Sequence, residues 1–219
     1  MQHRLLSERG IEHELAVEDP GLSPATVRPH QVHGVDVSLV DEQGRLSLAE
    51  ADAVISRQPG VDVGIVTADC VPILVAIDEG RAVCAIHAGW RGLAAGVVEN
   101  ALSVLWGGDS LRGGDRVAVV GPHIGSCCYE VDEPVLEALR SRYPQWLDAV
   151  CRPSRPGHVH LDLTKAVTEV LLEAGFQPEQ IGFLPDSCTS CSSERFHSYR
   201  RDGKRAGRML HRIAARRSS

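Results

Sequence analysis

The feature that most constrains the fold is a pair of apolar segments joined by a short turn. Ile73 to Ile77 and Ala82 to Ile86 are runs of small and β-branched residues, and Asp78-Glu79-Gly80 separates them. Runs of this length bounded by turn residues predict two buried strands. An antiparallel hairpin would return the outer ends of both strands to one edge of a sheet. Cys70 and His87, which flank the pair, are therefore predicted to be neighbours in space.

Further apolar segments predict an α/β fold. Strands are expected around 35–39, where valine and leucine alternate with polar residues, and at 51–55, 61–67, 116–120 and 181–184, the last of these being the final strand. Helices are expected at 93–105, 133–143 and 161–174, the last with Asp162 as its cap and Gly175 as its stop. Residues 1–24 are polar and turn-rich, without a sustained period, and residues 107–115 form a glycine-rich loop.

Length and hydropathy favour a single catalytic domain over residues 1–219. The chain contains nothing that resembles a Pro/Ser-rich linker. Its 43% of hydrophobic residues arrive in runs of five to seven, far short of a membrane span. The first ten residues lack the apolar region of a secretory signal, so a cytoplasmic location is expected. Seven cysteines, an odd number, agree with a reducing compartment in which thiols stay free for metal or catalysis.

The charge is distributed unevenly. The formal net charge is −6, but residues 195–219 hold nine Lys/Arg and one Asp, a net of +8, which leaves −14 on residues 1–194. A basic segment of this kind is typical of nucleic-acid binding. This one also contains Phe196, Tyr199 and Met209, so we expect a folded segment and no nucleic-acid partner. Some of its arginines could instead bind a phosphate or carboxylate of a small substrate.

Three side chains suit a metal site. If His33, Cys70 and His87 converge, two imidazoles and a thiolate leave a fourth position open, which is the catalytic pattern for zinc. Copper also accepts this ligand set. A copper site for electron transfer would require an axial methionine, however, and a multicopper oxidase would require many paired histidines, so Cu²⁺ is less favoured. An alternative without metal makes Cys70 the nucleophile and His87 its base in a cysteine hydrolase.

Polar residues around this group complete the predicted site. Asp69 precedes Cys70 and is predicted to orient a metal ligand. Gly89 and Gly92 flank Trp90 and Arg91 at the predicted start of a helix, where backbone N–H groups and a guanidinium would face an anion. The simpler interpretation is that the two glycines only permit a tight turn.

The remaining cysteines are predicted to be structural. Cys127 and Cys128 are adjacent in sequence, so we expect both to be buried and not to ligate one metal together. Cys188 and Cys191 form a CxxC, which by itself indicates zinc or a redox pair. Without a second CxxC, loop cysteines are favoured over a metal site there.

Five motifs resemble the laccase-domain family, whose members have been called polyphenol oxidases, purine nucleoside phosphorylases and peptidoglycan editing factors. They are HQVHG (30–34), TADCVP (67–72), AIHAGWRG (85–92), GPHIGSCCYEV (121–131) and DSCTSCSSERFHSYRRDGKRAGRM (186–209). The resemblance implies a single α/β domain with layered mixed sheets and outer helices, similar to bacterial cysteine deamidase toxins. It also places the family's metal triad on His33, Cys70 and His87.

The resemblance further implies an activity. It is zinc-dependent phosphorolysis of adenosine, inosine, guanosine and methylthioadenosine, with adenosine deamination as a further reaction. Phosphate would approach from Arg91, while Tyr129 and Arg200 would contribute to the pocket wall by motif position. Alternatives that stay open are a hydrolase that edits peptidoglycan precursors and a copper polyphenol oxidase. Members usually carry a longer segment before HQVHG, so part of the substrate pocket is expected to be missing or built differently here.

Overall fold

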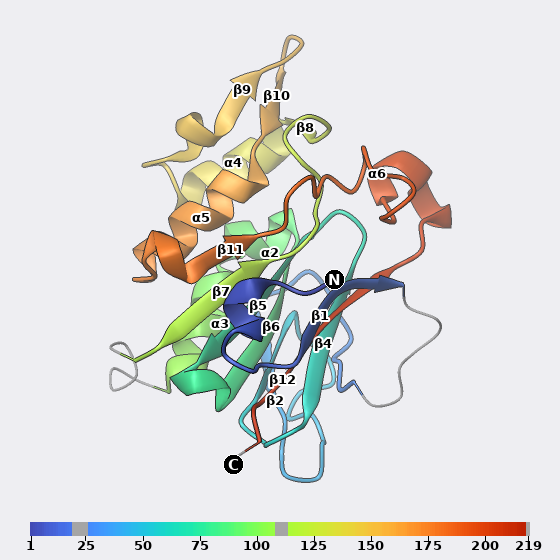
Figure 1. The fold of residues 1–219 in the computed structure, drawn as a ribbon. Coiled ribbons are helices and arrows are strands. Elements are labelled where there is room, and N and C mark those ends of the chain that lie inside the picture. Colours follow the sequence, from blue (N-terminus) through green and yellow to red (C-terminus); the bar gives the residue numbers. More distant parts are fainter. Residues whose placement is uncertain (19–25, 108–113, 218–219) are drawn as a thin grey trace.

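The computed structural model describes residues 1–18, 26–107 and 114–217, and it has a layered α/β architecture (Figure 1). A six-stranded mixed sheet lies in the middle, helices pack on one face, and a three-stranded antiparallel sheet packs on the other. The predicted class of fold, α/β with layered mixed sheets and outer helices, is thus confirmed. The similarity to cysteine deamidase toxins remains a prediction.

The central sheet has the strand order β11-β7-β5-β6-β3-β2. Its strands are β2 (Val37–Leu39), β3 (Ala53–Ser56), β5 (Val71–Ile77), β6 (Ala82–Ala88), β7 (Arg116–Val120) and β11 (Ile181–Phe183). β5 and β6 form the predicted antiparallel hairpin, in which Val71 pairs with Ala88 and Ile77 with Ala82. Cys70 and His87 therefore lie at its open end.

Both faces of this hairpin are buried, which explains its unbroken apolar sequence. Ile73 and Val75 point into the core beneath the helices, whereas Leu74 and Ala76 point into the core beneath the second sheet. Because successive side chains of a strand point to opposite faces, a strand between two layers must be apolar at every position.

The second sheet has the order β1-β12-β4 and corrects two expectations. β1 (His13–Glu18) and the short helix α1 (Arg4–Ser7) lie in the N-terminal segment predicted to be irregular. β12 (Met209–Ala214), not the strand at 181–184, is the final strand, and it pairs with both β1 and β4 (Asp62–Thr67). The basic C-terminal segment is folded, as predicted, because its apolar residues complete this sheet.

The helix predicted at 93–105 is two helices. α2 (Trp90–Ala95) ends at Gly96, whose φ of 94° lies in the left-handed region, and α3 (Val97–Trp106) begins directly after it. Glycine tolerates this conformation without steric cost, so the helix is interrupted while the spacing of apolar residues continues. The other two predicted helices are confirmed as α4 (Glu133–Arg142) and α5 (Leu163–Glu173).

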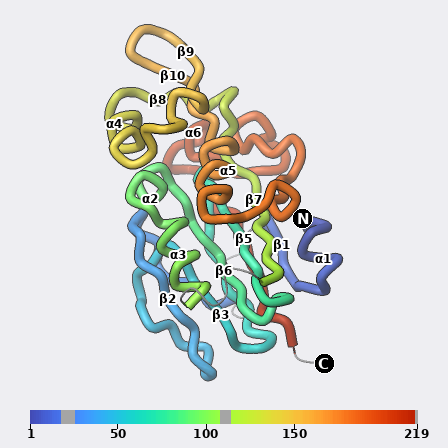
Figure 2. Tube along the Cα trace, turned by 90° about the vertical axis from the view of Figure 1, so that its left-hand side faces the viewer, coloured from blue at the N-terminus to red at the C-terminus, as the bar shows by residue number. Residues whose placement is uncertain are grey.

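Smaller elements complete the described chain. The sheet β8-β10-β9 consists of β8 (Glu130–Asp132), β9 (Cys151–Pro153) and β10 (His158–Leu161), and it lies beyond α4 and α5 (Figure 2). α6 (Tyr199–Asp202) lies within the last motif. Most of the predicted glycine-rich loop, residues 108–113, lies outside the described residues. No described helix combines the length and the hydropathy that a membrane span requires.

Candidate functional site

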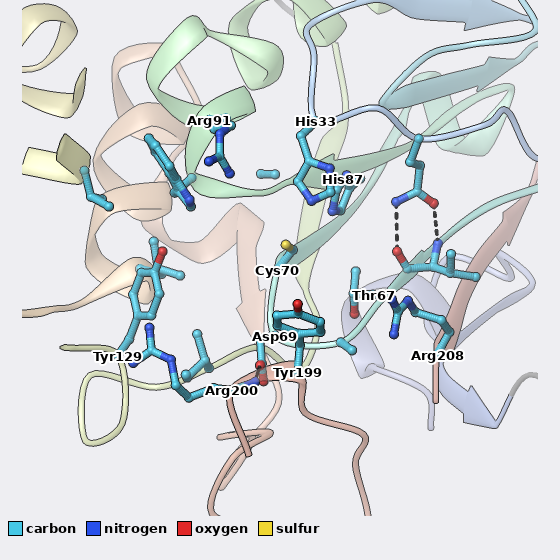
Figure 3. A pocket seen from close by; sticks show the side chains of 18 of the residues that line it. His33, Thr67, Asp69, Cys70, His87, Arg91, Tyr129, Tyr199, Arg200 and Arg208 are labelled. Atoms are coloured by element: carbon cyan, nitrogen blue, oxygen red, sulfur yellow. Dashed lines mark hydrogen bonds between the residues drawn. The ribbon is translucent and has the colours of Figure 1, made fainter. Parts of the chain in front are cut away.

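A cavity of about 980 Å³ opens at the end of the β5–β6 hairpin. All seven residues that the sequence placed in the site, His33, Asp69, Cys70, His87, Arg91, Tyr129 and Arg200, line it (Figure 3). Its volume lies at the upper end of the range for pockets that bind small molecules. The cavity therefore collects residues from five separate motifs in one place.

The predicted metal triad does converge. The side-chain ligand atoms of His33, Cys70 and His87 all lie within 4.8 Å of one another. The rings of the two histidines meet edge to face, with centroids 4.8 Å apart. Cys70 follows a bend after β4, His87 lies on β6, and His33 lies on the loop that precedes β2. His87 is 3% exposed, whereas His33 is exposed on the cavity side.

A buried carboxylate that the sequence analysis did not single out holds this group together. Asp52, fully buried at the start of β3, places Oδ1 2.7 Å from Nδ1 of His87. It also accepts hydrogen bonds from the backbone N–H groups of Val32, His33 and Gly34, at 2.7–3.1 Å. One carboxylate thus fixes the His87 ring and the loop that carries His33. The hydrogen bonds to the loop matter because His33 has a φ of 61°, a strained conformation for a non-glycine residue.

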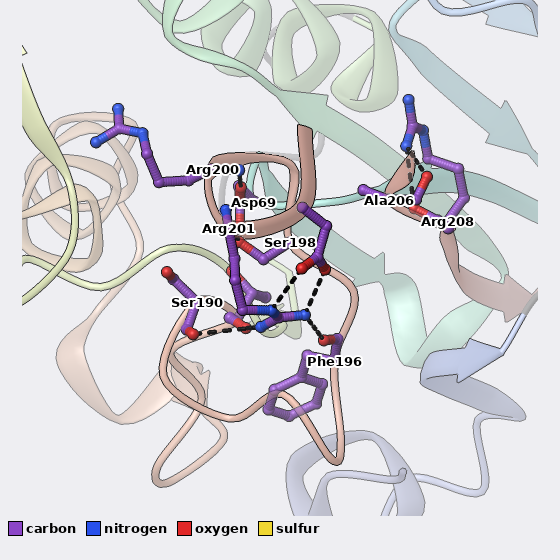
Figure 4. Close-up of polar contacts among 11 residues, drawn as sticks. Asp69, Ser190, Phe196, Ser198, Arg200, Arg201, Ala206 and Arg208 are labelled. Atoms are coloured by element: carbon purple, nitrogen blue, oxygen red, sulfur yellow. Dashed lines mark hydrogen bonds and ion pairs between the residues drawn. The ribbon is translucent and has the colours of Figure 1, made fainter. Parts of the chain in front are cut away.

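Asp52, and not Asp69, therefore orients a triad histidine. The carboxylate of Asp69 accepts hydrogen bonds from the hydroxyl of Thr189, at 2.5 Å, and from the backbone N–H of Arg200, at 2.6 Å (Figure 4). The expected orienting role of Asp69 is corrected accordingly. Its carboxylate instead attaches the 189–200 segment to the turn before Cys70.

The triad is electrostatically coupled in the absence of metal. Burial opposes ionisation of the Cys70 thiol, but hydrogen bonds and charge from His33 and His87 outweigh it and lower the pKa of Cys70 to about 6. Burial would lower the pKa of His87, but its hydrogen bonds to Asp52 and Cys70 raise that pKa to about 9. Near neutral pH the metal-free site thus contains a thiolate beside an imidazolium. A thiolate is the form that ligates a metal or attacks a substrate.

The two arginines of the Tyr-Arg-Arg-Asp run have different tasks. Arg200 lies over the ring of Tyr129, 5.3 Å from its centroid, and donates to the backbone carbonyls of Cys128 and Glu130. Arg201 instead points into its own loop, where it donates to the carbonyls of Thr189, Ser190 and Phe196 (Figure 4). Arg200 therefore lines the cavity together with Tyr129, while Arg201 stabilises the loop that presents it.

Arg91 lines the cavity as well, and Gly89 and Gly92 lie close to it in the sequence. The guanidinium of Arg91 lies 4.2 Å from the ring centroid of Trp90. Gly89 and Gly92 permit close packing, because a Cβ at Gly92 would lie 2.9 Å from the carbonyl oxygen of Gly34. The glycines thus have a packing reason of their own, which differs from the tight turn of the simpler interpretation, since neither has a positive φ. Sequence reasoning also missed Tyr199 and Arg208, which lie in the last motif and line the cavity.

Replacing Gly89 with alanine is expected to weaken metal binding about 10- to 100-fold, because small displacements of ligands have effects of this size. The backbone φ of −67° accepts alanine. The new Cβ, however, would lie 2.9 Å from Cδ2 of His33 and 3.2 Å from Sγ of Cys70, so the ligands must move. Competition with a chromogenic chelator, using zinc as the probe, measures the change.

Gly114→Ala is the matched control for this variant. Nothing lies within 4 Å of the Cβ that it would add, so its zinc affinity should equal that of the wild type. An unchanged affinity in Gly89→Ala would show that the triad is not the metal site.

Comparisons with known proteins agree with this geometry. The family model described as "Multi-copper polyphenol oxidoreductase laccase" matches residues 12–216. "Purine nucleoside phosphorylase YlmD" of Geobacillus stearothermophilus is 35% identical over 188 residues, which cover 82% of this chain and 68% of the relative. "Adenosine deaminase RL5", from an unknown prokaryotic organism, is 33% identical over 194 residues, which cover 83% of this chain and 72% of the relative.

Solved structures show the same likeness in three dimensions. The crystal structure of YlmD from Geobacillus stearothermophilus has a TM-score of 0.79 at 34% identity, covering 88% of this chain and 74% of that one. The crystal structure of the hypothetical protein YfiH from Bacillus licheniformis has a TM-score of 0.79 at 30% identity, with coverage of 88% and 74%. With the family model matching nearly the whole length, this chain belongs to the laccase-domain family that its five motifs resemble.

Proposed function

We propose that this protein is a zinc-dependent purine nucleoside phosphorylase. The observation that carries the proposal is the convergence of His33, Cys70 and His87 at a cavity large enough for a nucleoside. Relatives at 33–38% identity are named for purine nucleoside phosphorolysis or adenosine deamination, and they support an enzyme of this kind. The substrates we propose are adenosine, inosine, guanosine and methylthioadenosine, together with phosphate.

The donor set fits zinc. Two imidazoles and a thiolate are ligands that zinc prefers, and three of them leave one coordination position for water or substrate. Asp52 supplies the carboxylate that a zinc-bound histidine commonly has behind it. Bound zinc would lower the pKa of a bound water or polarise a substrate oxygen. Among the described residues, only this triad and a group of four cysteines bring three or more metal-ligating side chains together, and neither supplies the many histidines of a multicopper centre.

The residues around the triad suggest how the two substrates divide the cavity. Arg91 and Arg200 line the side of the cavity where Tyr129 also lies, so we place phosphate there (Figure 3). The planar fork of a guanidinium matches phosphate oxygens. Trp90, Tyr129 and Tyr199 offer ring surfaces to a purine base. Asp69 holds the Arg200 backbone in place and so positions this wall.

Incubation of adenosine with and without phosphate tests the proposed reaction. Phosphorolysis transfers the ribosyl group to phosphate, so adenine and ribose 1-phosphate should form together and only when phosphate is present. Liquid chromatography of the products gives both yields. Adenine release that does not depend on phosphate would show a nucleosidase instead and would overturn the proposal.

Adenosine deamination is the second candidate activity, and the similarity to the deaminase RL5 favours it. In that reaction water replaces the exocyclic amine, and inosine and ammonia appear without phosphate. The same chromatogram separates inosine from adenine.

We also propose a cytoplasmic location, because all seven cysteines are free and a thiolate at Cys70 needs a reducing compartment.

A further inference from the structure

Four cysteines come together outside the proposed active site. The Sγ atoms of Cys127, Cys128, Cys188 and Cys191 all lie within 4.8 Å of one another. The closest pairs join Cys191 to Cys128 at 3.3 Å and Cys127 to both Cys188 and Cys191 at 3.5 Å. Cys127 is exposed and Cys128 is half-buried, which corrects the expectation that both are buried. The two adjacent thiols also face the same group, contrary to expectation.

We propose that this cluster is a second metal site, which binds one structural zinc ion through four thiolates. Four sulfurs at about 2.3 Å from a tetrahedral zinc lie about 3.8 Å from one another, which falls within the observed spread. Cys188 and Cys191 have the CxxC spacing of half a zinc site. The ion would displace the thiol protons as it binds, and four protein ligands leave no position for substrate.

A pair of disulfides fits the arrangement less well. Disulfide formation needs two sulfurs about 2.05 Å apart in separate pairs. Here Cys127 and Cys191 each approach two other sulfurs, so the four form one group and not two couples. Adjacent cysteines such as Cys127 and Cys128 can both reach one ion only if the backbone turns. The backbone does turn here, because the carbonyl of Gly125 accepts hydrogen bonds from the N–H groups of Cys128 and Tyr129.

The backbone around the cluster is built for close approach. A Cβ at Gly125 would lie 3.2 Å from Cβ of Cys188 and 3.4 Å from Sγ of Cys127, so glycine lets the two loops meet. The N–H of Gly125 also points at Sγ of Cys188, 3.3 Å away, which stabilises a thiolate there.

The position of the cluster explains what the ion would do. Cys127 and Cys128 belong to the loop that continues into Tyr129, and Cys188 and Cys191 belong to the loop that leads to Arg200. Both Tyr129 and Arg200 line the cavity. Zinc at the cluster would therefore crosslink two loops across 61 residues of chain and hold one wall of the proposed active site.

Zinc content of the purified full-length protein tests the proposal, independently of the proposed activity. A variant with His33, Cys70 and His87 all changed to alanine keeps the cluster intact, and mass spectrometry of the metals should find one zinc per chain in it. Cys188→Ser combined with Cys191→Ser in that background should leave none. Cys151→Ser is the matched control, since this thiol is outside both groups and should leave the zinc content unchanged.

X-ray absorption at the zinc edge of the triad variant identifies the ligands. Four sulfurs at about 2.3 Å are expected. A shell with nitrogen or oxygen, iron in place of zinc, or a triad variant free of metal would each overturn the inference. The inference would also be overturned if the intact protein, purified under reducing conditions, had a mass lower by two hydrogens per disulfide. If the wild-type protein contains one zinc per chain and the triad variant still contains it, zinc at the proposed active site is refuted. This inference would then stand.

Discussion

Replacing Cys70 with alanine is expected to abolish adenosine turnover, with a loss of more than about 100-fold. Even residues that only support metal ligands cost 10- to 100-fold when removed, and Cys70 would be a ligand itself. Cys70 is also the only thiol of the triad, and it is hydrogen-bonded to both histidines. Initial rates of adenine and inosine formation, with zinc content measured on the same sample, check this result.

Cys151→Ala is the control for the loss of a thiol. Cys151 is half-buried at the start of β9, away from the cavity, so its loss should leave turnover near the wild-type value. Undiminished turnover in Cys70→Ala would place the reaction elsewhere in the molecule. Loss of turnover with full zinc retention at the triad would favour the nucleophilic role of Cys70 over its role as a ligand.

Replacing Asp52 with asparagine is expected to lower the affinity of the triad for zinc about 10- to 100-fold, with a parallel loss of activity. Asp52 faces four N–H donors, from His87 and from three successive backbone groups of the His33 loop. An amide has one acceptor oxygen and brings two donors, and each carboxylate oxygen of Asp52 accepts two of the four bonds, so two of these contacts become a donor facing a donor. Zinc affinity by chelator competition and kcat for adenosine phosphorolysis measure the effect.

The protonation of His87 separates a positioning role for Asp52 from general destabilisation. In metal-free protein, the hydrogen bond to Asp52 is among the causes that raise the pKa of His87 to about 9, so Asp52→Asn should lower it toward 6.5. NMR titration of the imidazole records this shift. Asp36→Asn, at an exposed carboxylate on the same loop, should change neither the titration nor zinc affinity. An unchanged His87 pKa in Asp52→Asn would contradict the positioning role.

The hairpin, and through it half of the site, could be predicted from the amino-acid sequence alone. The apolar runs of β5 and β6 leave little choice of partner, so the approach of Cys70 to His87 follows from local pattern alone. The place of Asp162 before an apolar helical period likewise predicts a cap, and its side chain accepts a hydrogen bond from the N–H of Lys165. Signals of this kind depend on residues within a few positions of each other.

Asp52 carried a weaker signal that could have been used. A carboxylate in the apolar run at 51–55 predicts a buried charge, and a buried charge requires partners. The sequence does not say which partners, because His87 lies 35 residues away on a strand whose pairing with β3 is set only by the assembled sheet. The helical period of the apolar residues also could not reveal the interruption between α2 and α3 at Gly96, since the apolar spacing continues through it.

Only the tertiary structure brought the four cysteines together and placed Tyr199 and Arg208 at the cavity. The cysteines and Arg208 lie on loops and Tyr199 begins the four-residue helix α6, so the direction of their side chains has no period and depends on how these segments are anchored. The anchors here are contacts between distant segments, such as Asp69 with Arg200 across 131 residues. Local sequence encodes which strands and helices can form, whereas the meeting of loops is decided by the packing of the layers that carry them.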